Sequence, residues 1–499
     1  MFDLAIRGAL VFDGSGSPPV KEDIAIAGGK IAARAPELGG AGETPAPPSG
    51  QTNVLDATGL ALMPGFVDMH THYDLALGWP GLSDHLLRQG ITTVIGGNCG
   101  IGEADVAKVL AEARAARLGV HVGVLASHGP LRSRVVPREE GRAARADEAL
   151  AIEREVARAL DAGALGLSWG PYHANALASK DELVAAARAL SSRGKPWVVH
   201  RRDEGAKALE ATEEAIEVAR LAGCPLHVSH LKIAGPLNWG RFDDLLGIVA
   251  RGRSRQDVTT DVYPYDGSLT YLNAILPGAL KADGRLLERL ATSAGRAEAL
   301  EGARRWFVER QPAEKIVLVA PAHPGAPRGG TLADAARVLG VADPAEAALR
   351  IIEVDGLGGW ATYRDMMKSE HVEQALELDG CAIASDAVPE DDGRPAAHPR
   401  CYGTFARALA RAHARGRLAD AVSRATRMPC ERFGLDRGTL RVGASADLVL
   451  VDLAKLRDAA TYAEPDRYPE GIRHVLVRGV FALRDGEPTG TRVGEVLTR

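Results

Sequence analysis

Cysteine is scarce in this sequence, and long apolar runs are absent. Five cysteines are scattered over 499 residues, with no Cys-x-x-Cys pair. An odd number of scattered cysteines argues against a disulfide framework and for a reducing compartment. The first residues carry no basic segment followed by a long apolar one, and no stretch approaches about 18 consecutive apolar residues. We therefore expect a cytoplasmic protein without a secretory signal or a transmembrane helix.

An excess of positive charge is also missing. Lysine and arginine number 60 against 65 aspartates and glutamates, which gives a formal net charge of −5. A nearly neutral chain of this length lacks the electrostatic footprint of nucleic-acid binding and the basic face that attracts proteins to membranes. We therefore expect a small-molecule substrate as the partner. The composition leaves the oligomeric state open.

Both ends of the chain have the character of short β-strands. Segments such as DLAIRGALVFDG near the start and ADLVLVDL near the end alternate apolar and polar residues between glycine-rich turns. A low-complexity stretch at 39–51, rich in glycine and proline, predicts an exposed loop. We expect one small β-sandwich domain built from residues 1–60 and 435–499.

The middle of the chain, residues 61–434, alternates strand-like runs with helical stretches that end at glycine. Eight such strand candidates predict an α/β fold, a (β/α)8 TIM-type barrel. The connection before the last strand is far longer than one β/α unit, so we expect an inserted subdomain or lid at about 280–378. The candidates lie at 62–72, 91–100, 120–129, 163–170, 196–204, 224–232, 258–265 and 381–387.

Side chains able to bind a metal follow most of these strands, where barrel enzymes carry their chemistry. His70 and His72 are two residues apart, so a strand directs both imidazoles to one face. Cys99, in the segment VIGGNCGIG, fits either a packed tight turn or a thiolate ligand. The remaining candidate tips are His128, His200, His230 and Asp386.

These residues are weak signals singly but consistent together. We select His230 over His227 on the sixth strand, because His230 lies nearer the C-terminal end. Nitrogen and sulfur donors with one carboxylate suit zinc better than magnesium or calcium. The predicted metal ligands are His70, His72, Cys99, His200, His230 and Asp386.

The sequence resembles the amidohydrolase superfamily and, within it, the N-acyl-D-amino-acid deacylases, also called D-aminoacylases. The resemblance extends over nearly the whole chain, and its more specific motifs are the NCG around Cys99, the SHLK that ends at Lys232 and the HPRCYGTF around Arg400. Other shared segments are PGFVDMHTHYD, ASHGPLR, DVYPY and FGLDRGTLRVGASADLVLVD.

The resemblance implies a role for each candidate. Many amidohydrolases bridge two metals with a carboxylated lysine from strand four, but the deacylases use a cysteine from strand two, and Cys99 stands at that position. Cys99, His200 and His230 would form the tight zinc site, and His70, His72 and Asp386 a second, weaker one. Lys232, Tyr263 and Arg400 would hold the substrate carboxylate, a task suited to an ammonium, a phenol and a guanidinium.

The resemblance also implies hydrolysis of N-acyl-D-amino acids to a carboxylic acid and a free D-amino acid. Zinc would polarise the amide carbonyl and acidify a bound water. Asp386 would accept the proton of that water and return it to the departing amine, and His128 would help to stabilise the oxyanion. The preference for the D form comes from the resemblance alone. The region after Tyr265 contains no nearby arginine, which favours neutral or hydrophobic side chains.

Two other functions remain open at this point. The same barrel could open a cyclic amide or imide, or cleave a dipeptide with a D residue. The cyclic reaction predicts a lysine at the tip of strand four, and the segment LGLSWG has none. A barrel without activity, used as a scaffold, would have lost metal ligands, whereas all six candidates are present.

Overall fold

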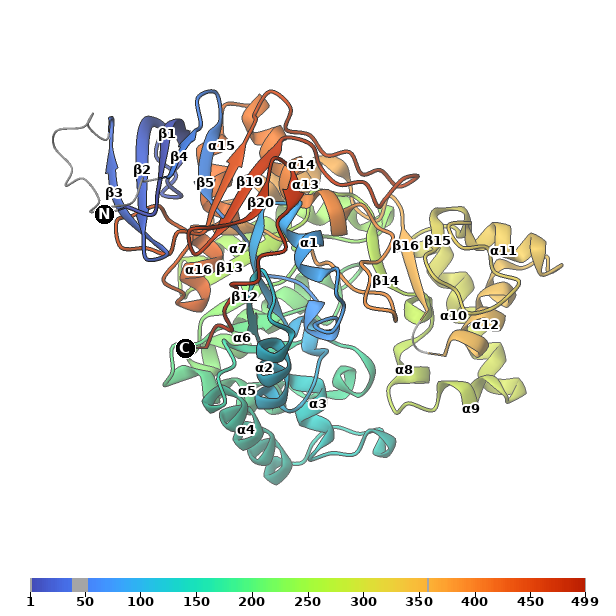
Figure 1. Cartoon of the computed structure of the whole chain (residues 1–499). Helices are drawn as coiled ribbons and strands as arrows, with labels where there is room; N and C mark the ends of the chain where they lie inside the picture. The colour runs from blue at the N-terminus through green and yellow to red at the C-terminus, as the bar shows by residue number, and fades with distance from the viewer. Residues whose placement is uncertain (1, 38–52, 357–358, 499) are drawn as a thin grey trace.

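Strands from both ends of the chain form one nine-stranded sheet in the computed structural model, which describes residues 2–37, 53–356 and 359–498. The strand order is β21-β20-β19-β18-β5-β1-β2-β3, with β4 paired to β1. Figure 1 shows the blue N-terminal and red C-terminal strands side by side. The predicted loop at 39–51 lies outside the described residues. The strands are β1 (Leu4–Val11), β2 (Val20–Ala27), β3 (Lys30–Ala35), β4 (Asn53–Asp56), β5 (Ala61–Pro64), β18 (Leu448–Val451), β19 (Ile472–Val477), β20 (Val480–Arg484) and β21 (Glu487–Pro488).

The two ends of the chain meet where β5 pairs with β18. This pairing is antiparallel and sets Leu62 opposite Leu450, and both side chains are fully buried. On the other side, β5 pairs in parallel with β1. Gly8 interrupts β1 with a φ of +73°, and a Cβ there would lie 2.7 Å from the hydroxyl oxygen of Thr58, so the irregular register of β1 depends on glycine. The sheet therefore ties both termini to the start of the central domain.

The predicted barrel is confirmed: each of the eight strand candidates contributes a strand. The third position is split into β8, which pairs with β7, and β9, which pairs with β10. All the pairings between barrel strands are parallel, and a parallel bridge from Thr71 to Ala387 connects the eighth strand to the first. The strands are β6 (Phe66–Asp68), β7 (Ile91–Gly96), β8 (His121–Val124), β9 (Ala126–Ser127), β10 (Leu167–Trp169), β11 (Trp197–Val199), β12 (Leu226–Val228), β13 (Val258–Val262) and β17 (Cys381–Ile383).

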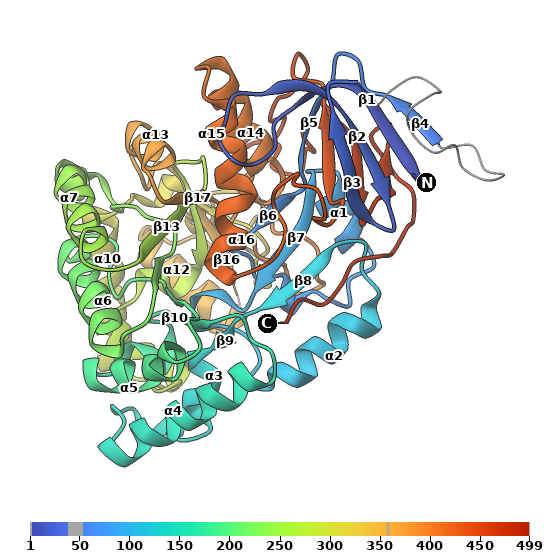
Figure 2. The ribbon, with the colours of Figure 1, turned by 90° about the vertical axis from the view of Figure 1, so that its left-hand side faces the viewer.

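Helices surround these strands, as Figure 2 shows. Local sequence fixes several of their ends: the hydroxyl of Ser179 accepts the backbone N–H of Glu182 at the start of α5, and Gly223, with a φ of +70°, ends α6. In the described part of the chain, no helix is both long and apolar enough to span a membrane. The helices are α1 (Leu82–Leu87), α2 (Val106–Ala116), α3 (His128–Ser133), α4 (Ala146–Asp161), α5 (Lys180–Ser191), α6 (Ala208–Ala222), α7 (Phe242–Arg253), α13 (Ser369–Glu377), α14 (Arg400–Ala414), α15 (Leu418–Ala425) and α16 (Arg427–Phe433).

A separate layer is inserted between β13 and β17 and lies to one side of the barrel (Figure 1). It has its own apolar core, which includes Leu272, Ile316, Leu349 and Met366. Ala375 of α13 instead belongs to the barrel core. The insertion thus begins before residue 280, at β14. Its elements are β14 (Ser268–Tyr271), α8 (Gly278–Lys281), α9 (Leu286–Leu290), α10 (Ser293–Glu309), β15 (Ile316–Leu318), α11 (Leu332–Val338), α12 (Pro344–Asp355) and β16 (Trp360–Tyr363).

The five cysteines are all buried and free. Burial raises the pKa of four of them, which makes these thiols unreactive packing groups. Cys99 alone has a pKa well below its usual value. The four inert cysteines are Cys224, Cys381, Cys401 and Cys430.

Candidate metal centre and active site

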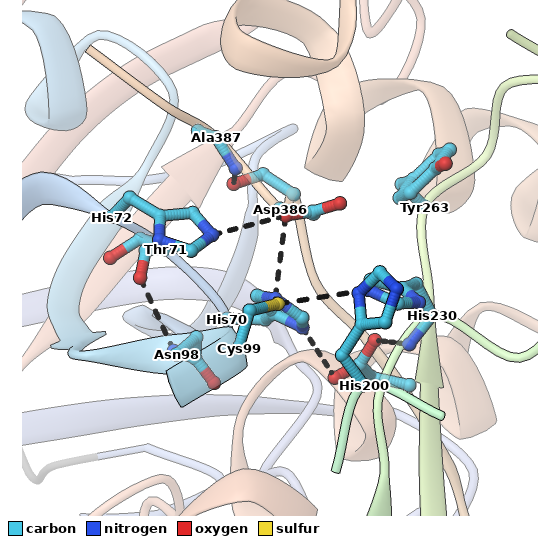
Figure 3. Close-up of polar contacts among 12 residues, drawn as sticks. His70, Thr71, His72, Asn98, Cys99, His200, His230, Tyr263, Asp386 and Ala387 are labelled. Carbon is cyan, nitrogen blue, oxygen red and sulfur yellow. Dashed lines mark hydrogen bonds and ion pairs between the residues drawn. The ribbon is translucent and has the colours of Figure 1, made fainter. Parts of the chain in front are cut away.

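A cavity of about 240 Å³ opens at the C-terminal ends of the barrel strands. Side chains from several strand tips converge on its floor, where Figure 3 shows them in close contact. The insertion supplies part of the wall. Among the lining residues are His72, Cys99, His200, His230, Lys232, Tyr263, Asp386 and Arg400 from the barrel, and Trp306, Trp360 and Tyr363 from the insertion.

The turn after β7 directs the Cys99 side chain toward this cavity. Cys99 has a φ of +56°, between glycines that also have positive φ, at positions 97 and 100. The side-chain amide of Asn98 donates to the carbonyl oxygens of Met69, Thr71 and Ile95, which fastens the turn to the first two strands. A side chain at Gly170, the tip of strand four, would place its Cβ 2.5 Å from the carbonyl oxygen of Cys99. The cysteine turn therefore occupies the position next to strand four, and no lysine fits there.

The first group of candidate ligands surrounds one oxygen of Asp386. Its Oδ1 lies 3.3 Å from Nε2 of His70 and 3.5 Å from Nε2 of His72, and the sulfur of Cys99 lies 3.4 Å from Nε2 of His70. In the set His70, His72, Cys99 and Asp386, one donor atom per residue lies within 4.8 Å of the others, and all four residues are buried. Such a set could hold a metal ion.

Cys99 also belongs to a second group, with His200 and His230, whose donor atoms again lie within 4.8 Å of one another. The sulfur of Cys99 is 3.8 Å from Nε2 of His230. Nδ1 of His200 lies 3.4 Å from the hydroxyl oxygen of Tyr172. One thiolate therefore stands between two possible metal positions, which is the chemistry expected of a shared soft ligand.

Carboxylates behind the cluster hold the imidazoles in place. Oδ2 of Asp261 lies 3.0 Å from Nδ1 of His70 and 2.9 Å from Nε2 of His227, and Oδ1 accepts the backbone N–H of His230 at 2.6 Å. Oε1 of Glu204 lies 2.9 Å from Nδ1 of His230. A carboxylate at Nδ1 leaves Nε2 free for a metal and increases the basicity of the ring. His227 is therefore one layer below the cluster, and His230 is part of it.

The sequence reasoning did not assign Glu204 and Asp261 these roles, although a signal for each was present. Glu204 lies two residues after Arg202 and four after His200, in the segment that follows the fifth strand. Asp261 is two residues before Tyr263, so an extended strand directs both side chains to the same face. Asp261 could have been found by searching back along the seventh strand, and Glu204 by searching the segment that follows the fifth strand.

Backbone strain coincides with the cluster. Among the described residues other than glycine, seven have positive φ, and three of them are candidate ligands: Cys99 at +56°, His230 at +35° and Asp386 at +52°. Side chains other than glycine rarely adopt this region, and such outliers gather at functional sites where the surrounding structure enforces them. The surrounding structure thus holds these three residues in an unfavourable backbone conformation that directs their side chains inward.

Opposing charges set the ionisation of the acidic groups. Burial raises the pKa of Asp386, but the charges of Arg400 and His70 outweigh this effect and hold the pKa well below its usual value. Burial likewise raises the pKa of Cys99, and the charge of His70 together with hydrogen bonds from His200 and His230 reverses the shift. The cluster therefore favours an ionised carboxylate and a thiolate, the forms that bind metal.

Lys232, Tyr263 and Arg400 lie together at one side of the cavity. The Arg400 guanidinium carbon lies 4.8 Å from the Tyr263 ring centroid, and Nζ of Lys232 lies 5.8 Å from it. Nη1 of Arg400 is 2.8 Å from Oδ2 of Asp386, and Nζ of Lys232 is 2.9 Å from Oε2 of Glu204. Nε of Arg400 is buried and has no hydrogen-bond acceptor among the described residues. An incoming carboxylate could satisfy this donor.

His128 is the predicted site residue that the structure does not bring to the cluster. It begins α3 and is fully buried, with Nδ1 3.4 Å from Oδ1 of Asn175 and Nε2 3.6 Å from Oε1 of Glu182. Arg132 donates to the same Glu182 carboxylate at 2.7 Å. Burial lowers the pKa of His128 to about 4, so its ring is neutral near pH 7. The side chain turns away from the cavity because the strand leads straight into a helix, and its expected role as an oxyanion donor is not retained.

Comparison with known proteins agrees with this geometry. The model of the Amidohydro_3 family, described as the amidohydrolase family, matches residues 53–252 and 381–482. The chain belongs to the amidohydrolase family. The unmatched residues 253–380 contain the whole insertion, which supplies part of the wall of the cavity.

Full-length relatives place this metal-dependent amidohydrolase among the D-aminoacylase-like enzymes. The N-acyl-D-glutamate deacylase of Alcaligenes xylosoxydans xylosoxydans is 34% identical, with 100% of this chain and 96% of that protein covered. The D-aminoacylase of the same organism is 32% identical over 100% of this chain and 98% of that protein. A crystal structure of N-acyl-D-glutamate deacylase from Bordetella bronchiseptica, complexed with zinc and a phosphonate inhibitor, matches at 32% identity and a TM-score of 0.82, with both chains fully covered.

Proposed function

We propose that this amidohydrolase uses zinc to hydrolyse the amide bond of N-acyl-D-amino acids, releasing a carboxylic acid and a free D-amino acid. The observation that carries the proposal is the placement of a thiolate shared by two ligand groups beside three carboxylate-binding side chains, around one cavity. The names of the relatives supply the D configuration. A linear amide with a free carboxylate matches both the ligand cluster and the three side chains proposed to bind a carboxylate.

The residues suit zinc because they offer imidazole and thiolate donors with one carboxylate. Cys99, His200 and His230 would hold the tighter ion, and His70, His72 and Asp386 would complete a second, weaker site through the shared sulfur. A bound zinc ion supplies polarisation of the amide carbonyl and a water whose pKa is lowered toward about 7. Asp261 and Glu204 keep the Nε2 atoms of His70 and His230 free for it.

Arg400, Lys232 and Tyr263 would orient the substrate through its carboxylate. The unsatisfied Nε of Arg400 and the adjacent phenol of Tyr263 present donors in a buried environment, where hydrogen bonds to a carboxylate are strong. The ammonium group of Lys232 forms an ion pair with the carboxylate of Glu204. With the carboxylate fixed at this side, the amide lies over the ligand cluster.

Asp386 would carry the proton. Its Oδ1 faces the cluster and its Oδ2 is paired with Arg400, which keeps the group ionised and ready to accept a proton. As water adds to the amide carbon, Asp386 takes one proton from it and delivers that proton to the amide nitrogen as the carbon–nitrogen bond breaks. The other proton of the water stays with the acyl group, so the products are a carboxylic acid and an amine, and no other reactant is needed.

The cavity favours a neutral side chain on the amino acid. Its outer wall carries the aromatic residues of the insertion. Apart from Arg400, the lining arginines already have partners: Arg310 lies 3.4 Å from a carboxylate oxygen of Asp203, Arg202 donates twice to Glu214 at 2.9 Å, and Arg201 donates to the carbonyl of Lys232 at 2.7 Å. An acidic side chain would meet no uncommitted cation there, so hydrophobic D-amino acids are the proposed substrates.

Release of free amine from matched pools of N-acetyl-D- and N-acetyl-L-amino acids, with zinc-loaded protein, tests the function directly. Hydrolysis confined to the D pool is expected, with leucine, methionine and phenylalanine ahead of glutamate and aspartate. Hydrolysis of neither pool would overturn the proposal and direct the search to cyclic amides and dipeptides with a D residue. Equal hydrolysis of both pools would refute the stereochemical part alone.

A further inference from the structure

A second cavity, of about 220 Å³, adjoins the metal cavity. Ile101, Tyr172 and Tyr271 line both. Tyr172 and Tyr271 form an edge-to-face pair with their ring centroids 6.3 Å apart, and the hydroxyl of Tyr172 lies 3.4 Å from Nδ1 of His200. Tyr172 therefore contacts a candidate metal ligand and also lines the second cavity.

The second cavity and the carboxylate-binding residues lie on opposite arcs of the barrel. Its walls come mainly from the segments after the second, third and fourth strands, which include Ile101, Gly129 and Ala174. Lys232 and Tyr263 follow the sixth and seventh strands, and Arg400 begins α14, the helix after the eighth strand. In a closed eight-stranded barrel these two sets face each other across the mouth, with the ligand cluster between them.

The covalent structure of an N-acyl amino acid fits this division. The side chain is attached to the same carbon as the carboxylate, so it must stay near Arg400 and the insertion. The acyl chain is attached to the other side of the scissile bond, so it extends beyond the cluster, away from the carboxylate. A substrate with its carboxylate on one arc and its amide over the cluster therefore directs its acyl chain to the opposite arc.

We propose that the second cavity binds the acyl chain of the substrate, and that it suits neutral alkanoyl groups longer than acetyl. This inference rests on the proposed function. Ile101, Ala174 and the faces of Tyr172 and Tyr271 give the cavity apolar walls. The hydroxyl of Ser133 is already bonded to the carbonyl of Gly129.

Charge in the wall supports a neutral occupant. In the described part of this cavity the only cation is Arg138, and the carboxylates of Glu139 and Asp283 lie close enough to influence it. Asn175 is committed to His128 through its Oδ1, 3.4 Å from Nδ1 of the ring. An acyl group with a terminal carboxylate would compete with Glu139 and Asp283 for the charge of Arg138, whereas each methylene of an alkanoyl chain gains burial.

The test compares N-acetyl-, N-butanoyl- and N-hexanoyl-D-leucine on the zinc-loaded enzyme. Burial of a methylene corresponds to about a fourfold gain in kcat/KM, so kcat/KM for the hexanoyl substrate is expected to exceed that for the acetyl substrate by at least about tenfold. Ala174 is buried in the wall, and Ala174→Phe fills the cavity. This variant should abolish the gain in kcat/KM for N-hexanoyl-D-leucine. It should keep kcat/KM for N-acetyl-D-leucine within about threefold of the wild type.

Two further variants distinguish a loss of acyl-chain binding from a general disturbance of the fold. Ser133 is exposed at the outer part of the cavity, so Ser133→Trp should fold normally. It should lower kcat/KM for the hexanoyl substrate more than for the butanoyl substrate. Ala274 lines only the metal cavity, so Ala274→Phe should change the preference for the amino-acid side chain and leave the acyl-length profile unchanged.

The outcomes are distinct. A wild-type profile that is flat or falls with chain length overturns the acyl site while leaving the deacylase function standing. An equal loss with all three substrates in both Ala174→Phe and Ser133→Trp also overturns it. Absence of turnover with every N-acyl-D-leucine overturns the proposed function, and the acyl site with it.

Discussion

Arg400 pairs with one oxygen of Asp386 at 2.8 Å, while the other oxygen of the same carboxylate lies 3.3 Å from Nε2 of His70. A single carboxylate thus connects the residue proposed to hold the substrate carboxylate with the candidate metal cluster. The left-handed backbone of Asp386, with a φ of +52°, sets this orientation. In the proposed mechanism, this carboxylate would couple substrate binding to proton transfer.

Asp386→Asn is expected to lower kcat by about 100- to 10,000-fold, because the amide cannot accept the proton of the attacking water. The tighter ion should remain, since Cys99, His200 and His230 are unchanged, so metal analysis should still find one zinc per chain. Asp392→Asn, at an exposed residue that pairs with Arg394, is the matched control and should retain full activity. Normal turnover by Asp386→Asn would exclude the proposed role.

Cys99→Ser should remove both ions, because the thiolate belongs to both ligand groups and a serine hydroxyl is a poor ligand. His72→Asn should remove only the weaker ion, since His72 belongs to one group. Mass-spectrometric metal analysis after dialysis distinguishes the two. Cys224→Ser alters a buried cysteine outside the cluster and should retain the wild-type metal content. Two ions bound to Cys99→Ser would show that the sulfur is not a shared ligand.

His128→Gln is expected to change kcat by less than about tenfold, because the ring contacts Asn175 and Glu182 and does not reach the cavity. Its main effect should be on stability, through the buried pairing of Glu182 with Arg132. Kinetics with N-acetyl-D-leucine and a thermal melt measure the two effects separately. A loss of about a thousandfold in kcat with an unchanged melting temperature would restore His128 as a catalytic group.

Asp203→Asn should shift the side-chain preference toward glutamate. Oδ1 of Asp203 accepts the backbone N–H groups of Gly205 and Lys207, a role that asparagine can keep, while Oδ2 neutralises Arg310. Without that charge, Arg310 becomes available to an acidic substrate. We expect the ratio of kcat/KM for N-acetyl-D-glutamate over N-acetyl-D-leucine to rise about five- to tenfold, the modest gain typical of a partly exposed ion pair.

The double variant Asp203→Asn with Arg310→Gln is the control for this shift. It should return the ratio to the wild-type value, because the cation that would bind the glutamate side chain is gone. A ratio that stays high in the double variant would show that Arg310 is not the residue responsible.

Acid should destabilise the fold through His85. Burial lowers the pKa of His85 to about 3, and its ring nitrogens lie 2.9 Å from the hydroxyl of Tyr73 and 3.2 Å from that of Tyr468. The unfolded chain binds the proton near pH 6.5 and the native one only near pH 3, so stability falls as pH falls through this window. The loss reaches about 3 kcal/mol by pH 4.

His85→Gln removes this titration and should flatten the fall of the melting temperature between pH 6.5 and pH 4, even if the variant is less stable at pH 7. His413→Gln, at an exposed histidine, is the control and should follow the wild-type curve. Parallel curves for His85→Gln and the wild type would contradict the assignment.

Much of the barrel and of the cluster could be predicted from local sequence. Apolar runs followed by helical periodicity mark β/α units, and the polar residue at the end of each run, such as His70 or His230, identifies a strand tip. The rule that parallel strands present these tips at one end of a barrel then brings distant residues together. His128 departs from this rule because its strand leads directly into α3, whose first turn buries the ring. A strand pattern does not contain that information.

The sequence by itself determined the donor types and their order along the chain, because a strand's period of two and the chemistry of imidazole, thiolate and carboxylate are local properties. Only the tertiary structure decided which donors share an ion, how Arg400 connects to Asp386 and which arginines are already neutralised. Those relationships depend on distances between side chains far apart in sequence, and the distances are set by barrel closure and by the packing of the insertion. For the same reason the second cavity beside Tyr172 could not be predicted: its walls come from four separate segments that meet only in the folded chain.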